Sequence, residues 1–434
     1  MDKYIQCCGI NIKKVGFFEL FFNKTMIIAY ILLAIGLIGW YEIMMLRWAH
    51  DFVNTRSIIN LINSGGADHI KMAAEAIKDQ IFNLHEIEEV NKAEPWGLFV
   101  VQYTYLLYGG SALIFLTALA ELFHLKIAPK VAAALITFGI SMVFGGLVSI
   151  ATDLANVLHI YWMFLNPQPQ SGMWLMLPLY TIYIPFTFIE IYFLITNKRD
   201  LARKLALWLV IIGILIDLGE FFIQGLLFNL NIPRHLWTDI PQLWIYFLIT
   251  GGVTGIGGAA IFGFLGLRNK PYFSDFMKVV ANTGIVLAVL VALYELVNFM
   301  SVDPKFFDLL LSGSPISWMY WTWIILGIII PFILYFTKKP GWIFLGGISA
   351  VIGAFFMRVS FTFGGNIVPV TNRFGTGYEA TSIYRLDSLK PYAYIAPHTM
   401  EILIIIGCIG VGIAVYSLLD SLFDVRNIND SVEH

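Results

Sequence analysis

Ten long apolar stretches, separated by short polar segments, dominate the chain from residue 25 onward. Each is long enough to cross a bilayer as a helix, which takes about 20 residues. The breaks between stretches carry proline or basic residues, as at Pro129, Pro271 and Lys338-Lys339-Pro340. The ten predicted membrane spans are residues 25–46, 97–123, 130–152, 173–195, 202–229, 241–266, 277–299, 317–336, 341–363 and 396–419.

The composition agrees with this pattern. The 434 residues are 58% hydrophobic and only 13% charged, whereas a soluble domain has about 25% charged residues. We therefore predict an all-α polytopic membrane protein, with a kink at Pro185 in the fourth span. The net charge of −2 gives no indication of nucleic-acid binding.

The distribution of Lys and Arg predicts the orientation. Short loops on one face are basic, for example at Lys198-Arg199 and Lys338-Lys339, whereas the segment 153–172 on the other face has neither residue. Basic loops stay in the cytoplasm. We therefore expect a multi-pass protein of the cell membrane with both termini cytoplasmic, including an N-terminal head at residues 1–24.

Two predicted external segments are long. Residues 47–96 include an acidic stretch with helical spacing from Ala67 to Val90, and residues 364–395 are rich in Gly, Tyr and Thr. Such loops can form a docking surface for an extrinsic partner or can be solvated connections, and both alternatives stay open. No soluble segment is large enough to hold a cofactor, so extrinsic redox chemistry would belong to another chain.

The segment 142–174 is unusual among the connections. An apolar helix ends at Asp153, and His159, Tyr161 and Trp162 follow before the turn at Asn166-Pro167. A carboxylate, an imidazole and aromatic rings would then meet where hydrocarbon gives way to water. These groups could hydrogen-bond a small amphipathic molecule that enters from the lipid.

Ionisable residues within the spans are few, and such residues are costly and usually functional. Asp217 and Glu220 lie near the midplane, three residues apart and hence on one helix face. Glu190 and Glu121 lie toward the inner side. Asp217, Glu220, Glu190 and Glu121 could form a proton path, whereas Glu295, Arg358 and Glu401 could instead be structural, pairing with one another to hold helices together.

The outward polar residues suit a redox-active lipid. A quinone needs hydrogen-bond partners at its two oxygens and groups that exchange protons, and Tyr, His, Asp and Gln supply both. A membrane haem usually needs paired axial histidines within the bundle, and no two histidines fall on facing spans at matching depth. We expect no haem or metal in this chain.

Several short motifs occur together in one order. They are Trp96-Gly97-Leu98, Asp153-Leu154, Asn166-Pro167, Ser171-Gly172-Met173, Thr250-Gly251-Gly252, the series Gly353, Arg358 and Gly364-Gly365, and finally Pro397 with Glu401. Over residues 95–420 the chain resembles the NrfD-like family, the membrane subunits of polysulfide reductases and related respiratory complexes. The extra first span resembles the ten-helix branch, which includes membrane subunits of respiratory hydrogenases and sulfur-cycle complexes.

The resemblance implies two four-helix bundles, at residues 97–229 and 241–363. The first span and the segment 396–434 would flank them. It also implies a quinone site in the first bundle. An iron–sulfur, ferredoxin-like subunit would lie on the external face, with a molybdopterin or nickel–iron catalytic subunit beyond it. By position, the quinone-binding residues would be Gln102, Tyr103, Asp153, His159, Asp217 and Arg234.

The resemblance leaves the quinone type, the electron direction and the terminal substrate open. Two other classes of function compete with it. A secondary transporter would suit the midplane charges and the two similar bundles, but the polar residues lie toward one face and no broken half-helix recurs in both halves. A structural membrane anchor without bound quinone is the third alternative.

Overall fold

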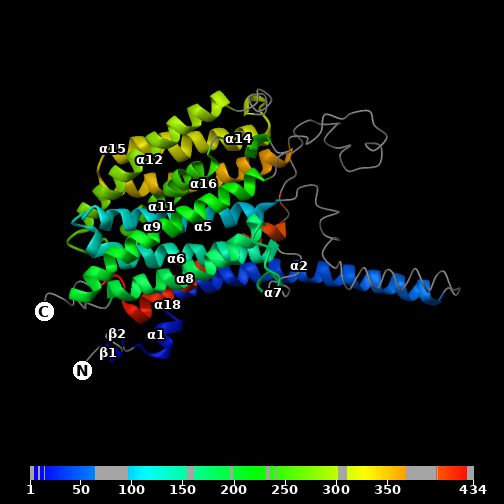
Figure 1. Ribbon diagram of the computed structural model, residues 1–434, viewed down its shortest axis with the longest axis horizontal. Coiled ribbons are helices and arrows are strands. Elements are labelled where there is room, and N and C mark those ends of the chain that lie inside the picture. Colours follow the sequence, from blue (N-terminus) through cyan, green and yellow to red (C-terminus); the bar gives the residue numbers. More distant parts are fainter. Residues whose placement is uncertain are drawn as a thin grey trace.

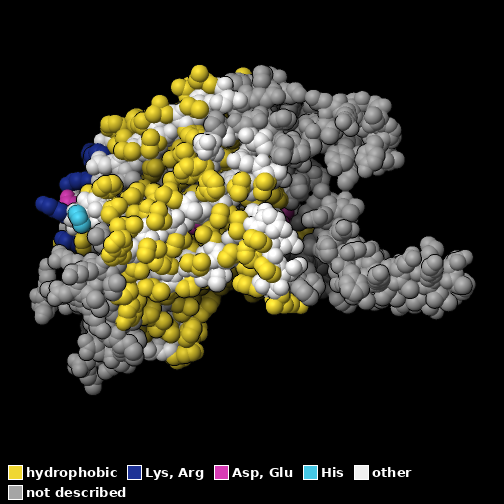
Figure 2. All heavy atoms as spheres, in the orientation of Figure 1, with side chains coloured by type: hydrophobic (Ala, Val, Ile, Leu, Met, Phe, Trp, Pro, Cys, Tyr) yellow, Lys and Arg dark blue, Asp and Glu magenta, His cyan; other side chains and the backbone are white. Residues whose placement is uncertain are grey.

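The fold is all-α and polytopic, as predicted. The computed structural model describes residues 4–7, 10–13, 15–63, 96–153, 161–195, 199–230, 235–238, 240, 242–301, 310–367, 397 and 399–427. Within these ranges, ten helices are long and apolar enough to cross a membrane. Large hydrophobic side chains lie exposed along them, and Figure 2 shows how they cover the flank of the molecule. A continuous apolar surface of this kind is suited to contact with the membrane interior.

The ten spans match the predicted ones to within a few residues. They lie in α2 (Lys24–Asn63), α5 (Leu98–Leu122), α6 (Ala128–Asp153), α8 (Gly172–Ile195), α9 (Arg199–Asn229), α11 (Leu243–Gly266), α12 (Phe273–Ser301), the pieces α14 (Pro315–Thr322), η2 (Trp323–Ile329) and α15 (Ile330–Phe336), α16 (Pro340–Ile367) and α18 (Thr399–Phe423). Two short helices, α7 (Trp162–Leu165) and α10 (His235–Thr238), lie between spans.

Three details differ from the prediction. Helix α2 continues to Asn63, so residues 47–63 are helical and extend beyond the bundle (Figure 1). The eighth span contains a π-helical segment, η2, just before Pro331. The N-terminal head includes a hairpin, β1 (Tyr4–Cys7) with β2 (Ile10–Lys13), followed by α1 (Phe17–Phe21). The stretch Ala67 to Val90 and residues 368–395 lie outside the described residues.

The helices pack as two groups. Helices α5, α6, α8 and α9 contact one another in a ring, and α11, α12, the eighth span and α16 form a second group. Helix α2 packs against α18, which packs on α6, so the first and last spans lie together beside the first group (Figure 1). Helix α5 joins the two groups through its contacts with α11 and α16.

Glycines allow α5 to approach both neighbours closely. A Cβ at Gly110 would lie 2.4 Å from the Gly139 carbonyl oxygen on α6, and one at Gly251 would lie 2.7 Å from the Tyr108 carbonyl oxygen on α5. A larger side chain at either position would push the helices apart. The close packing places Tyr108 directly at the seam between the two groups.

The start of α2 and the end of α18 lie at the same end of the molecule. Asn23 donates a 3.2 Å hydrogen bond to Ser421 and accepts a 3.0 Å bond from Ser417. The visible Lys and Arg side chains gather at this end (Figure 2). We call it the basic end.

Candidate functional site

A hydrogen-bonded network centred on Gln224 lies inside the first helix group. The Gln224 side-chain nitrogen donates to the hydroxyl of Tyr103 and, at 2.9 Å, to the hydroxyl of Tyr180. Its carbonyl oxygen accepts a 2.8 Å bond from Tyr108. All of these residues are buried. One amide from α9 thus holds three phenols from α5 and α8.

Two carboxyl groups continue the network toward the middle of the bundle. One oxygen of Glu220, Oε1, accepts hydrogen bonds from Tyr180 at 2.8 Å and from Ser111 at 3.0 Å. Asp217 lies close to Glu220 and to the Tyr183 hydroxyl. Neither Asp217 oxygen, nor Oε2 of Glu220, has a hydrogen-bond partner with good geometry among the described residues, and Tyr183 is the hydroxyl close enough to approach Asp217. Burying polar groups without partners is costly. Buried carboxyl groups of this kind are therefore typical of a functional site.

A trail of carboxyl groups leads from Asp217 toward the basic end. Asp217 interacts electrostatically with Glu190 on α8, and Glu190 interacts with Glu121 in the last turn of α5. Glu190 is buried and Glu121 is half-buried. The four residues predicted as a proton path therefore follow one another in order from the interior toward the basic end of the first group, near enough to interact electrostatically.

Helical spacing explains why these residues meet. Asp217, Glu220 and Gln224 follow the i, i+3, i+7 pattern on α9, and Tyr180, Tyr183, Thr187 and Glu190 follow a similar pattern on α8. Each series lines one helix face. Tyr103 and Ser111 lie on α5 with an axial separation of about 12 Å, at 1.5 Å per residue. The network therefore extends along more than a third of the hydrocarbon core, which is about 30 Å thick.

A second polar cluster lies in the other group, around Glu295 of α12. Tyr246 and Trp323 donate to its Oε1 at 2.7 and 2.9 Å, and Tyr320 donates to Oε2 at 3.0 Å. Trp323 is the first residue of η2, and π-helical turns often occur at functional sites. Both oxygens of this carboxyl group are thus satisfied, in contrast to those of Asp217.

Arg358 lies between the two clusters. Its Nη2 donates a 3.0 Å bond to Thr250, and its guanidinium lies 4.8 Å from the ring centroid of Tyr108 and 5.0 Å from that of Phe247. The side chain is 1% exposed, and Nε and Nη1 have no hydrogen-bond partner among the described residues. Arg358 forms no ion pair with Glu295 or Glu401 in the described chain, unlike the structural pairing considered from the sequence.

The other predicted residues are placed as follows. Gln102 is buried on α5, and its side-chain nitrogen has no partner among the described residues. Asp153 is the last residue of α6 and is half-buried, outside the network around Gln224. Glu401, in the first turn of α18, lies beside Gly97. His159 and Arg234 lie outside the described residues.

Sequence reasoning missed Gln224, Tyr108, Tyr180, Tyr183 and Ser111, which hold the carboxyl groups in place. The polar face of α9 would have revealed Gln224, because it lies one turn beyond Glu220. The tyrosines carried no signal, because interfacial tyrosines are common in membrane proteins. Within the described residues, no group of three His, Cys, Asp or Glu side chains could hold a metal ion.

Comparison with known proteins gives two results. No match is found among curated proteins. The family model described as polysulphide reductase, NrfD, matches residues 86–369, which is more than half of the chain. This match confirms the resemblance that the motif order indicated. The chain belongs to the NrfD polysulphide reductase family.

Proposed function

We propose that this protein exchanges electrons between the membrane quinone pool and an extrinsic iron–sulfur subunit. Membership of the NrfD family makes it a membrane subunit of a polysulfide reductase-type complex. The observation that carries the proposal is the buried network around Gln224, in which phenol, amide and carboxyl groups converge between α5, α8 and α9. A packed structural core seldom gathers so many polar groups, because each must be satisfied.

The residues present fit a quinone. A bound quinone would supply two-electron chemistry coupled to two protons. Its oxygens require hydrogen-bond donors, and the Gln102 amide and the Tyr103 hydroxyl, both buried on α5, would each provide one. Asp217 and Glu220 have oxygens without partners, on which a proton can be held. Asp153, with His159 and Arg234, would contribute at the outer end of the site.

The carboxyl trail supports proton coupling. Glu220 and Asp217 would pass protons to Glu190 and then Glu121, away from the site and toward the basic end. If the basic end faces the cytoplasm, as the positive-inside rule predicts, this movement crosses part of the membrane and is electrogenic. The iron–sulfur subunit would then dock at the opposite face, with the catalytic subunit beyond it.

Replacing Tyr103 tests this proposal. Tyr103→Phe removes one hydroxyl of the network, so quinone-linked electron transfer of the purified complex should fall about 100-fold or more, the usual range for a lost proton-transfer group. Tyr105→Phe is the matched control, because Tyr105 is also buried on α5 but donates to the Val351 carbonyl oxygen on α16 at 3.0 Å. Equal turnover of both variants, with intact assembly, would reject the site.

A further inference from the structure

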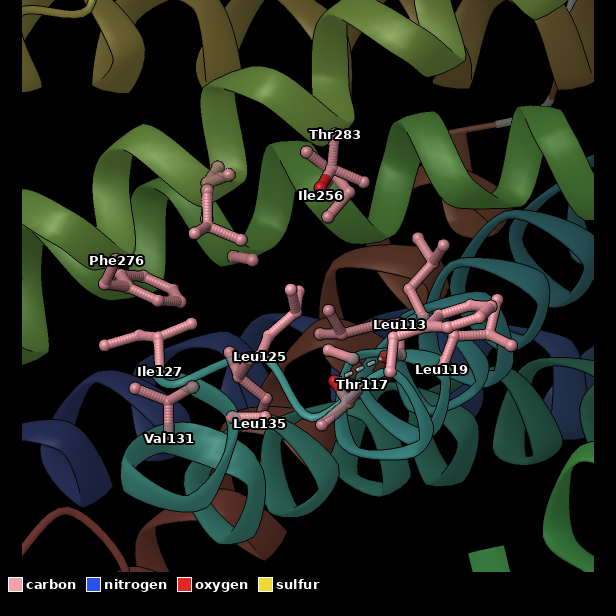
Figure 3. A pocket seen from close by; sticks show the side chains of 17 residues that line it. Leu113, Thr117, Leu119, Leu125, Ile127, Val131, Leu135, Ile256, Phe276 and Thr283 are labelled. Carbon is pink, nitrogen blue, oxygen red and sulfur yellow. Dashed lines mark hydrogen bonds between the residues drawn. The ribbon is translucent and has the colours of Figure 1, made fainter. Parts of the chain in front are cut away.

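A cavity of about 230 Å³ lies at the seam between the two helix groups, at the basic end. Helices α5, α6, α11 and α12 all contribute to its wall. Figure 3 shows side chains such as Leu113, Val131, Ile256 and Phe276 pointing into it. Phe123 and Leu125, at its rim, are 71% and 42% exposed, so the cavity opens to the surface of the bundle. It is separate from the network around Gln224.

The wall of this cavity is almost wholly apolar. Two threonines, Thr117 and Thr283, are the polar residues among its lining. Thr117 donates its hydroxyl to the Leu113 carbonyl oxygen at 2.7 Å, so that donor is already used. An apolar cavity of this kind excludes water and accepts a hydrocarbon guest. Its chemistry fits an acyl chain and does not fit a polar substrate.

Two lysines are adjacent in the chain to residues that line the cavity. Lys126 lies between the lining residues Leu125 and Ile127. Lys130 directly precedes the lining residue Val131 and lies above the ring of Tyr272, 5.9 Å from its centroid. Both lysines are exposed, and neither forms an ion pair in the part of the chain that the structure describes. Lys278, on α12, pairs instead with Asp275 at 3.2 Å. Two lysines that form no ion pair among the described residues therefore lie close in the chain to the wall of an apolar cavity.

We propose that this cavity binds one anionic phospholipid, with an acyl chain between the helix groups and the phosphate headgroup on Lys126 and Lys130. Basic clusters beside grooves between membrane helices are suited to anionic headgroups. The lipid would contact α5 and α6 from one group and α11 and α12 from the other. It would thus fill a seam that the protein side chains leave open, and it would stabilise the packing of the two groups.

Native mass spectrometry of the full chain in detergent tests the proposal, with dioleoyl phosphatidylglycerol and dioleoyl phosphatidylcholine as probes. The wild type should retain one phosphatidylglycerol in preference to phosphatidylcholine. The double variant Lys126→Gln/Lys130→Gln should bind phosphatidylglycerol about tenfold more weakly or worse, because each lysine contributes to anionic lipid binding. Thr283→Phe, which fills the cavity, should lose the lipid although both lysines remain.

Two controls make the result specific. Lys13→Gln/Lys24→Gln removes the same charge from the N-terminal segment, which contacts α18 and α8 and does not line the cavity. Thr283→Val keeps the volume of the side chain. Both should retain the lipid. Equal retention of the two phospholipids by the wild type, or equal losses in the control and the test variants, would overturn the proposal. So would retention of a quinone in this cavity in place of a phospholipid.

Discussion

The guanidinium of Arg358, on α16 of the second helix group, lies 4.8 Å from the ring of Tyr108, on α5 of the first. Tyr108 in turn donates to Gln224, whose amide donates to Tyr180, and Tyr180 donates to Glu220. The buried Arg358 cation is thus connected, through the Tyr108 ring and two hydrogen bonds, to Tyr180, which donates to the buried Glu220 carboxyl group. The second group therefore contributes charge to the site in the first.

Arg358→Met should separate stability from function. The buried guanidinium has one hydrogen bond and two nitrogens without partners among the described residues. Burying a charge without full pairing is costly, so an apolar side chain at this position should not destabilise the protein. We expect an unchanged or higher unfolding temperature in detergent, together with slower quinone-linked turnover. Arg426→Met is the contrast, because Arg426 is bonded to Asp420 at 3.1 and 2.5 Å and should lose stability without losing turnover. A large loss of stability in Arg358→Met would show that the residue is structural.

Gln224→Leu should damage both stability and turnover. It leaves the Tyr108 hydroxyl without its acceptor and removes the donor to Tyr103 and Tyr180. Each stranded buried group should cost about 1–3 kcal/mol. Unfolding midpoints and turnover of the purified complex measure the two effects, with Gln170→Leu, at an exposed position, as the control. Wild-type values for Gln224→Leu would contradict the described network.

Glu190→Gln should uncouple proton movement from electron transfer. The variant removes the link between Asp217 and Glu121 while leaving the network around Gln224 intact. In proteoliposomes containing the complex, electron transfer should persist while the quinone-linked membrane potential falls. Glu42→Gln, on the exposed face of α2, should have no effect. A normal potential in Glu190→Gln would exclude this route.

Gly353→Ala should disrupt the contact between α16 and the π-helical segment. A Cβ at Gly353 would lie 2.2 Å from the backbone nitrogen of Gly327, whereas one at Gly341, on the same helix, meets nothing within 4 Å. Overpacking of this kind costs about 1–3 kcal/mol or more, and Gly341→Ala should instead be neutral or stabilising by up to about 1 kcal/mol. Similar unfolding midpoints for the two variants would contradict the close packing at η2.

The sequence was sufficient to predict the ten spans and the family, because span length and composition are local properties. The extension of α2 was not predictable, because polar residues after a span are typical of a loop. The π-helix of η2 was not predictable either, because it depends on the packing around Trp323 and Gly327. Asp217, Glu220, Glu190 and Glu121 were identifiable because charges in spans are rare. The tyrosines and Gln224 required the three-dimensional arrangement of α5, α8 and α9.

Photo-crosslinking with an azido-quinone locates the quinone site in this chain without the partner subunit and without turnover. The full chain in lipid nanodiscs would be labelled, digested and mapped by mass spectrometry, with excess unlabelled quinone as competitor. We expect competitor-sensitive label on the α5 segment from Gln102 to Ser111 and on the α9 segment from Asp217 to Gln224. Specific label confined to the second helix group, or to the cavity at the basic end, would contradict it.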